Sequence, residues 1–162
     1  PPRSTLFPYT TLFRSGPEGF GPQEKTWLRM QLEEMPPDDF VVVLSHCFFY
    51  SSGYVDEGTG KPWYDHSEML REVAPLLAGK ADLVVSGHNH YMEWIEADGT
   101  AWAVVGAMGG KPDPVPSYKS RGSVWFSQGV FGRLVLEIRQ GALACEFQDQ
   151  NGRPLFARTI TK

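Results

Sequence analysis

The chain has 162 residues, of which 41% are hydrophobic and 21% charged, the balance of an ordinary globular domain. Its formal net charge of -4 and its pI of about 5.5 argue against a nucleic-acid-binding patch, because such surfaces usually carry a basic stripe. No run of 18 apolar residues occurs, so no membrane segment is expected, and no signal peptide is visible.

The first fifteen residues differ in character from the rest of the chain. The triplet Thr-Leu-Phe occurs at 5–7 and again at 11–13, and residues 1–15 show neither helical nor strand periodicity. Residues 5–15 resemble the conceptual translation of a short-read sequencing adapter; the alternative is an N-terminal tail. We interpret residues 1–15 as non-native and residues 16–162 as the protein proper. This interpretation predicts a gene cut upstream of residue 16.

The next part of the chain predicts alternating helices and buried strands. Residues 23–35 and 67–78 each place apolar side chains on one helical face, and a proline at position 75 weakens the second helix near its end. Residues 40–44 and 82–86 are short continuous apolar runs, typical of strands buried on both faces. A strand, a helix and a strand in this order predict a parallel βαβ crossover, with a long loop over 45–64.

The pattern changes to antiparallel β-structure after residue 90. Residues 91–97 and 100–105 flank Asp98-Gly99, a strong signal for a two-residue hairpin. Residues 107–122 are rich in glycine, proline and serine and predict an irregular loop. Three further strands are expected at 131–139, 142–149 and 155–161, with glycine-containing turns between them.

Three of the four histidines lie where predicted strands end. His46 follows the first buried strand, and His88 and His90 follow the second, within Gly87-His88-Asn89-His90. Because ligands bind beyond the carboxyl ends of parallel strands, we expect the three imidazoles at one edge of the sheet. Gly87 allows a tight backbone turn there, and a loop geometry would direct His88 and His90 toward two neighbouring ions. Neutral imidazole is a good ligand for Zn, Fe and Mn.

These two motifs carry a resemblance to a known family. An apolar strand with Ser-His at 40–46, and an apolar strand with Gly-His-Asn-His at 82–90, resemble the last two metal motifs of calcineurin-like metallophosphoesterases. The resemblance covers 23–162. It implies an α/β fold, the C-terminal half of a four-layer α/β/β/α sandwich in truncated form.

The resemblance also implies a function and a ligand set. In that family the histidines that match His46 and His88 bind one metal ion, and the one that matches His90 binds the other. The two divalent or trivalent ions, Mn, Fe or Zn, lie roughly 3.5–4 Å apart and clamp the oxygens of a phosphoester during its displacement. A metal-bound hydroxide is the nucleophile. The expected activity is therefore metal-dependent hydrolysis of a phosphoester substrate; the substrate itself, the compartment and the oligomeric state stay open.

The sequence departs from the family pattern upstream of the first motif. The family's earlier motifs supply an Asp, a His, a bridging Asp and an Asn-His pair, and this sequence has neither an Asp-x-His before residue 40 nor a Gly-Asn-His anywhere. Three neutral imidazoles cannot balance the charge of two dications. We therefore expect weak metal binding and no activity from this chain alone, and we assign no catalytic residue within it.

Four other residues near these motifs have more than one interpretation. Tyr50, His66 and Asn89 are candidate substrate-pocket residues, although packing for Tyr50 and the start of a helix for His66 are the ordinary interpretations. Cys47 beside His46 could suggest a thiol hydrolase, but neighbouring side chains on an extended chain point apart. The alternative to an enzyme is a β-rich module that binds a partner or a structural metal. The enzyme hypothesis predicts a bare sheet edge and exposed apolar surface, and the module hypothesis predicts neither.

Overall fold

The computed structural model describes residues 21–47, 49–53, 55, 58 and 67–162, apart from the side chains of 67 and 68. The described helices are α1 (Pro22–Glu34), α2 (Ser67–Glu72) and α3 (Ala74–Leu77). One sheet contains β1 (Val42–Ser45), β2 (Leu83–Ser86), β3 (Met92–Ala97), β4 (Thr100–Val105) and β5 (Ser123–Ser127). A second sheet contains β6 (Gly132–Arg139), β7 (Ala142–Asp149) and β8 (Pro154–Thr161). Among the described helices, none is long and apolar enough to cross a membrane.

The predicted βαβ crossover is confirmed. β1 and β2 are parallel neighbours, in a register that runs from Val42 opposite Leu83 to Ser45 opposite Ser86. The helix expected over 67–78 is instead two short helices, α2 and α3, that meet at Val73. Proline at position 75 lacks the N–H that a continuous helix would use, which accounts for the break.

The five-stranded sheet has the order β1-β2-β4-β3-β5. The predicted hairpin between β3 and β4 is present, and Asp98 and Gly99 have φ values of 52° and 74°, as a turn with two left-handed central residues requires. Strand β5, which pairs antiparallel with β3, was not predicted. It is short and lies between a glycine-rich loop and another glycine, so its sequence gives little strand signal.

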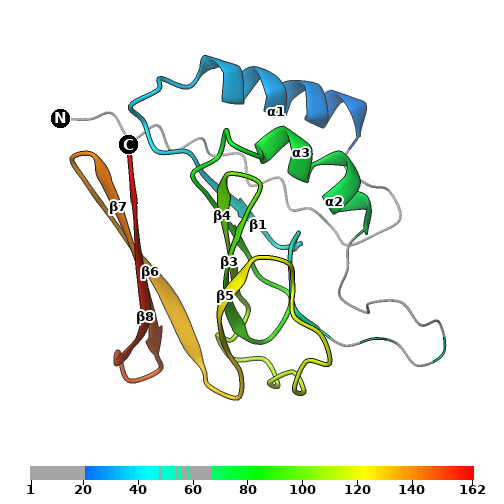
Figure 1. Ribbon diagram of the computed structural model, residues 1–162, viewed down its shortest axis with the longest axis vertical. Coiled ribbons are helices and arrows are strands. Elements are labelled where there is room, and N and C mark those ends of the chain that lie inside the picture. The colour runs from blue at the N-terminus through cyan, green and yellow to red at the C-terminus, as the bar shows by residue number, and fades with distance from the viewer. Residues whose placement is uncertain (1–20, 48, 54, 56–57, 59–66) are drawn as a thin grey trace.

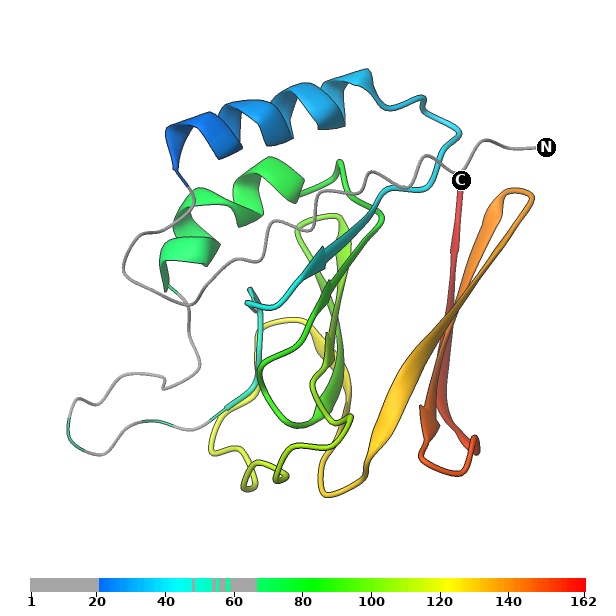
Figure 2. The same ribbon diagram turned by 180° about the vertical axis from the view of Figure 1, so that it is seen from behind.

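The elements form three layers, with helices on one face of the five-stranded sheet and the second sheet on the other (Figures 1 and 2). On the helix side, Val84 and Trp102 belong to a core cluster with side chains of α2 and α3. On the other side, Leu83 and Trp94 pack in a second cluster with Phe147 of β7. The central strands are therefore buried on both faces, which explains their continuous apolar sequences. Of the four layers expected, the described residues form three.

One side of this sandwich is open among the described residues. Strand β1 pairs with β2 alone, and its Leu44 side chain is 71% exposed. On β6, Leu136 and Ile138 stand opposite Cys145 and Leu143, so they share the inner face of the second sheet, yet they are 37% and 64% exposed. We call Leu44, Leu136 and Ile138 the open flank. An unpaired strand edge and apolar side chains of this kind normally have a partner.

Candidate metal centre

The register of β1 and β2 brings their carboxyl ends to the same level. Ser45 and Ser86 are the last paired residues, and the N–H of Gly87 donates to the Ser45 carbonyl at 3.3 Å. The structure brings the next side chains together: His88 Nδ1 lies 3.2 Å from His46 Nε2, with the two rings nearly perpendicular at 83°. Parallel pairing of two short strands thus places imidazoles that are far apart in sequence side by side.

The segment between Gly87 and Tyr91 is a pair of tight turns. The N–H of Asn89 donates to the Gly87 carbonyl at 2.8 Å, and the N–H of Tyr91 donates to the Asn89 carbonyl at 2.9 Å. Within this turn His88 has a left-handed backbone conformation, with a φ of 63°. A non-glycine residue held in such a conformation costs of order 1–3 kcal/mol, and strain of this kind concentrates at functional sites.

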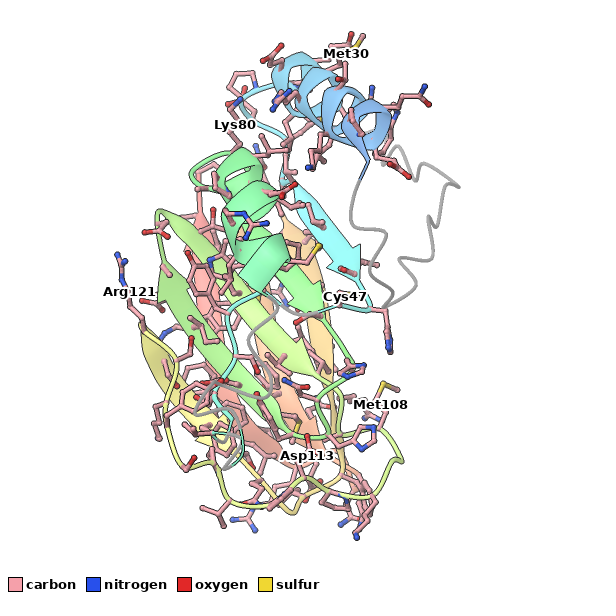
Figure 3. All side chains as sticks on the ribbon, turned by 90° about the vertical axis from the view of Figure 1, so that its right-hand side faces the viewer. Met30, Cys47, Lys80, Met108, Asp113 and Arg121 are labelled. Atoms are coloured by element: carbon pink, nitrogen blue, oxygen red, sulfur yellow. The ribbon has the colours of Figure 1, made fainter. Side chains whose placement is uncertain are left out.

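His90 makes its contacts with the loop that follows β4, not with the other two histidines. Its Nδ1 atom is 2.8 Å from the carbonyl oxygen of Lys111, and its backbone N–H donates to the carboxylate of Asp113 at 2.7 Å. Strands β1, β2 and β4 run parallel, so Cys47 after β1 and Met108 and Asp113 after β4 follow the same edge of the sheet (Figure 3). The His46–His88 pair and the loop that contacts His90 therefore lie at the same edge of the sheet.

A buried hydrogen-bond network supports the turn from below. The Asn89 side-chain amide donates to the Ser51 hydroxyl at 2.6 Å and to the Tyr91 hydroxyl at 3.2 Å. The Tyr91 hydroxyl also bonds to the Ser51 hydroxyl and donates to the Ser52 carbonyl. These contacts tie the loop after His46 to the turn that carries His88. Asn89, a predicted substrate-pocket residue, is fully buried, and its side-chain N–H groups anchor the turn. Among the described residues its Oδ1 atom has no hydrogen-bond partner.

Glu93 continues the network one step further into the molecule. Its carboxylate accepts hydrogen bonds from the N–H and hydroxyl of Ser52, at 2.8 and 2.5 Å, and from the Ser123 hydroxyl at 2.6 Å. Burial raises the pKa of the Glu93 carboxyl, and the serine donors only partly oppose that effect. Sequence reasoning missed this group. The signal was present, because Glu93 has the same strand parity as Ile95, a core residue.

The remaining predicted residues do not meet the histidines through any described contact. Tyr50 packs edge-on against Trp102, with ring centroids 4.9 Å apart, and its hydroxyl donates to the Asp98 carboxylate at 2.5 Å. Burial and Asp98 together raise the pKa of Tyr50 to about 12. These contacts direct Tyr50 to the β3–β4 hairpin, at the end of β3 away from His90. His66 lies outside the described residues.

Cys47 has the surroundings of a core residue. Its side chain is 4% exposed and belongs to the cluster under the helices. Burial raises the pKa of the thiol, which disfavours the thiolate that nucleophilic catalysis requires. Both observations oppose a thiol hydrolase that uses this residue.

The geometry of the histidine pair fits a shared metal ion. Two ring nitrogens that each lie about 2.0–2.1 Å from one tetrahedral ion are about 3.3 Å apart. The 3.2 Å between His46 Nε2 and His88 Nδ1 matches that spacing. Within the described parts of the chain, however, no three His, Cys, Asp or Glu side chains form a group that could hold an ion. The described residues therefore offer a two-nitrogen half-site, with His90 adjacent to it in sequence.

Comparison with known proteins shows that the fold of this chain is shared with solved structures. No family model matches the sequence, and no curated protein matches it. Among solved structures, the purple acid phosphatase PPD1 from yellow lupin (Lupinus luteus) seeds superposes with a TM-score of 0.69 at 19% identity, over 87% of this chain and 28% of that one. GAP50, the anchor in the inner membrane complex of Plasmodium, superposes with a TM-score of 0.66 at 23% identity, over 86% of this chain and 42% of that one. The chain spans less than half the length of each, and over that span the expected metallophosphoesterase fold is confirmed.

Proposed function

We propose that this chain is one portion of a metal-dependent phosphoester hydrolase and supplies three histidine ligands to a dinuclear metal centre. The observation that carries the proposal is the 3.2 Å approach of His46 and His88 at the carboxyl ends of two parallel strands. This is the edge of an α/β sheet where ligands bind. The fold that surrounds it is shared with a purple acid phosphatase.

Each histidine has a defined part in this proposal. His46 Nε2 and His88 Nδ1 would hold one ion, and His90 would hold the second. Bound Mn, Fe or Zn ions would polarise the phosphoryl oxygen and lower the pKa of water. The chain's own residues hold and orient the ligands: the network from Asn89 to Ser51 fixes the turn beneath His88. No proton donor or acceptor for the reaction is assigned within the described residues.

The open flank is where the rest of such a site would join. Imidazoles bring no negative charge, so two dications require carboxylates from elsewhere. An additional parallel strand beside β1 would place its own carboxyl end next to His46. It would also cover Leu44, which is 71% exposed at that edge. We therefore propose that the complete enzyme contains further strands beside β1, and that residues 16–162 alone are inactive.

The test is to extend the gene upstream and assay the complete protein. We expect hydrolysis of p-nitrophenyl phosphate or bis(p-nitrophenyl) phosphate that depends on added Mn²⁺, Fe or Zn²⁺. Changing His46, His88 or His90 to alanine should each reduce this activity about 100-fold or more, since even outer-shell partners of ligands contribute 10–100-fold. Cys47→Ser is the matched control and should retain activity. An intact protein without metal-dependent phosphoester hydrolysis would overturn the proposal.

A second candidate is a non-catalytic module that binds a partner protein. GAP50 supports it, because an anchor protein has the same fold with a TM-score of 0.66. The lack of a three-ligand group among the described residues is compatible with it. The same complete protein discriminates the two functions. A partner-binding module would bind its target equally well after His46→Ala and His88→Ala, and would hydrolyse none of the phosphoesters.

A further inference from the structure

The loop after β4 contacts His90 at three points. The carbonyl oxygen of Lys111 is 2.8 Å from His90 Nδ1, and the Asp113 carboxylate accepts the His90 backbone N–H at 2.7 Å. Gly110 packs directly against the ring, because a Cβ at this position would lie 2.4 to 2.7 Å from the ring atoms Cε1, Nε2 and Nδ1. No side chain larger than hydrogen fits there without moving the imidazole.

The Lys111 contact determines which ring nitrogen carries the proton. A backbone carbonyl can only accept a hydrogen bond, so Nδ1 of His90 must donate, and a neutral ring then leaves Nε2 as a bare lone pair. A histidine side chain free in water prefers the opposite tautomer, with the proton on Nε2. In metal sites, a hydrogen-bond acceptor next to one ring nitrogen commonly fixes the tautomer in which the other nitrogen can bind the ion.

Asp113 is itself held in place. Its backbone N–H donates to the His90 carbonyl at 3.4 Å, and its own carbonyl accepts from the Gln128 side-chain amide at 2.5 Å. His90 and Asp113 are thus joined by two hydrogen bonds, with the loop from Gly110 folded over the ring between them. Gly110 and the Lys111 carbonyl therefore belong to a segment that is held at Asp113 by hydrogen bonds to His90 and to Gln128.

We propose that Gly110, the Lys111 carbonyl and Asp113 act as a positioning clamp that fixes His90 as the Nδ1–H tautomer and leaves Nε2 available to a ligand. That the ligand is a metal ion rests on the proposed function. The tautomer follows from the contacts alone.

The experiment is two-bond ¹H–¹⁵N NMR on the full chain labelled with ¹⁵N-histidine. Spectra are recorded at alkaline pH, where the two tautomers of neutral imidazole give distinct two-bond patterns. His90→Gln assigns the His90 signals. We expect His90 to show the Nδ1–H pattern. A His90 ring that is predominantly Nε2–H in the unmodified chain would overturn the clamp.

Paired variants separate positioning from folding. Asp113→Ala should shift His90 from mainly Nδ1–H toward mainly Nε2–H, whereas Asp113→Asn should restore the Nδ1–H pattern, because an amide oxygen still accepts the backbone N–H. Gly110→Ala should cause the same shift. Lys111→Ala is the matched control: it retains the carbonyl and should change nothing. If Gly110→Ala also changes the signals of His46 and His88, the comparison of Asp113→Ala with Asp113→Asn is the deciding test. A His90 tautomer that is unchanged in both Asp113 variants would refute the clamp.

Zn²⁺ titration of the complete protein, labelled in the same way, tests the proposed function independently, because the carboxylates that the proposal requires are then present. Binding should shift the His90 Nε2 resonance of the unmodified chain and leave Nδ1 protonated. An Nδ1–H tautomer that persists without any response of Nε2 to Zn²⁺ would leave the clamp in place and count against His90 as a metal ligand.

Discussion

At the scale of single residues, Glu93 stands out because its carboxyl group is fully buried. It is a carboxyl with no exposed surface, on a strand that faces the core, and three donors from two serines surround it. Burial penalises its charged form and raises its pKa, so the folded chain holds this proton more tightly than the unfolded chain does. The donors then act mainly to keep a buried polar group satisfied.

This raised pKa predicts a pH dependence of stability. The protonated Glu93 side chain makes its full contribution to the free energy of unfolding below its unfolded pKa of about 4.3. That contribution is lost as the pH rises through the higher pKa of the folded state. We expect the urea midpoint of the unmodified chain to fall over that interval and the midpoint of Glu93→Gln to fall less. Glu96→Gln, an exposed neighbour on β3, is the control. Identical pH profiles for the unmodified chain and Glu93→Gln would contradict the assignment.

At the scale of elements, the aromatic side chains of β7, β8 and the first sheet join the two sheets. Phe147 is fully buried, with its ring centroid 4.9 Å from that of Trp125 and 6.4 Å from that of Trp94. Trp125 also stacks on Phe156 at 4.9 Å with an angle of 11° between the rings. Rings from four strands, β3, β5, β7 and β8, thus pack together, which holds the second sheet against the first.

Removing the central ring of this cluster should be costly. Phe147→Ala is expected to lower the free energy of unfolding by about 3–5 kcal/mol, because it deletes a fully buried aromatic side chain and leaves a cavity. Glu146→Ala, on the opposite face of the same strand, should change it by less than about 0.5 kcal/mol. Urea unfolding monitored by tryptophan fluorescence measures both. Equal effects of the two changes would show that β7 does not join the sheets.

At the scale of the whole molecule, the open flank contrasts with the outer face of the second sheet. Strand β6 presents Arg133, Glu137 and Arg139 to the outside, while Leu136 and Ile138 point inward and remain partly bare. Apolar residues on an inner face that no described residue covers are the exposed surface that the proposed function predicts.

The flank should therefore make the chain associate with itself when no other partner is present. We expect sedimentation velocity to show concentration-dependent oligomers of the unmodified chain and a monomer for Ile138→Lys, with unchanged unfolding by urea. Val135→Lys, on the outer face of the same strand, should still associate. A chain that stays monomeric at high concentration would support the self-contained module instead of a portion of an enzyme.

Local signals in the sequence predicted most of the fold. Apolar runs predicted β1 and β2, and the Asp98-Gly99 pair predicted the hairpin between β3 and β4. Both predictions succeed because these features depend on residues that are close in sequence. The meeting of His46 and His88 followed from the parallel crossover. The contacts that fix the histidines could not be predicted in this way. Lys111 and Ser51 reach the turn only through tertiary packing, and no periodicity connects them to it.

The end of β4 has one further consequence for the turn that carries the histidines. A Cβ on Gly106, the residue after β4, would lie 1.8 Å from the Asn89 carbonyl oxygen, so the backbone at Gly106 packs directly against the backbone of the turn. Every substitution of glycine introduces a Cβ, so any other residue at position 106 would clash with the turn. We therefore expect a glycine directly after this strand in any relative that keeps the same turn, although glycine bears no functional group.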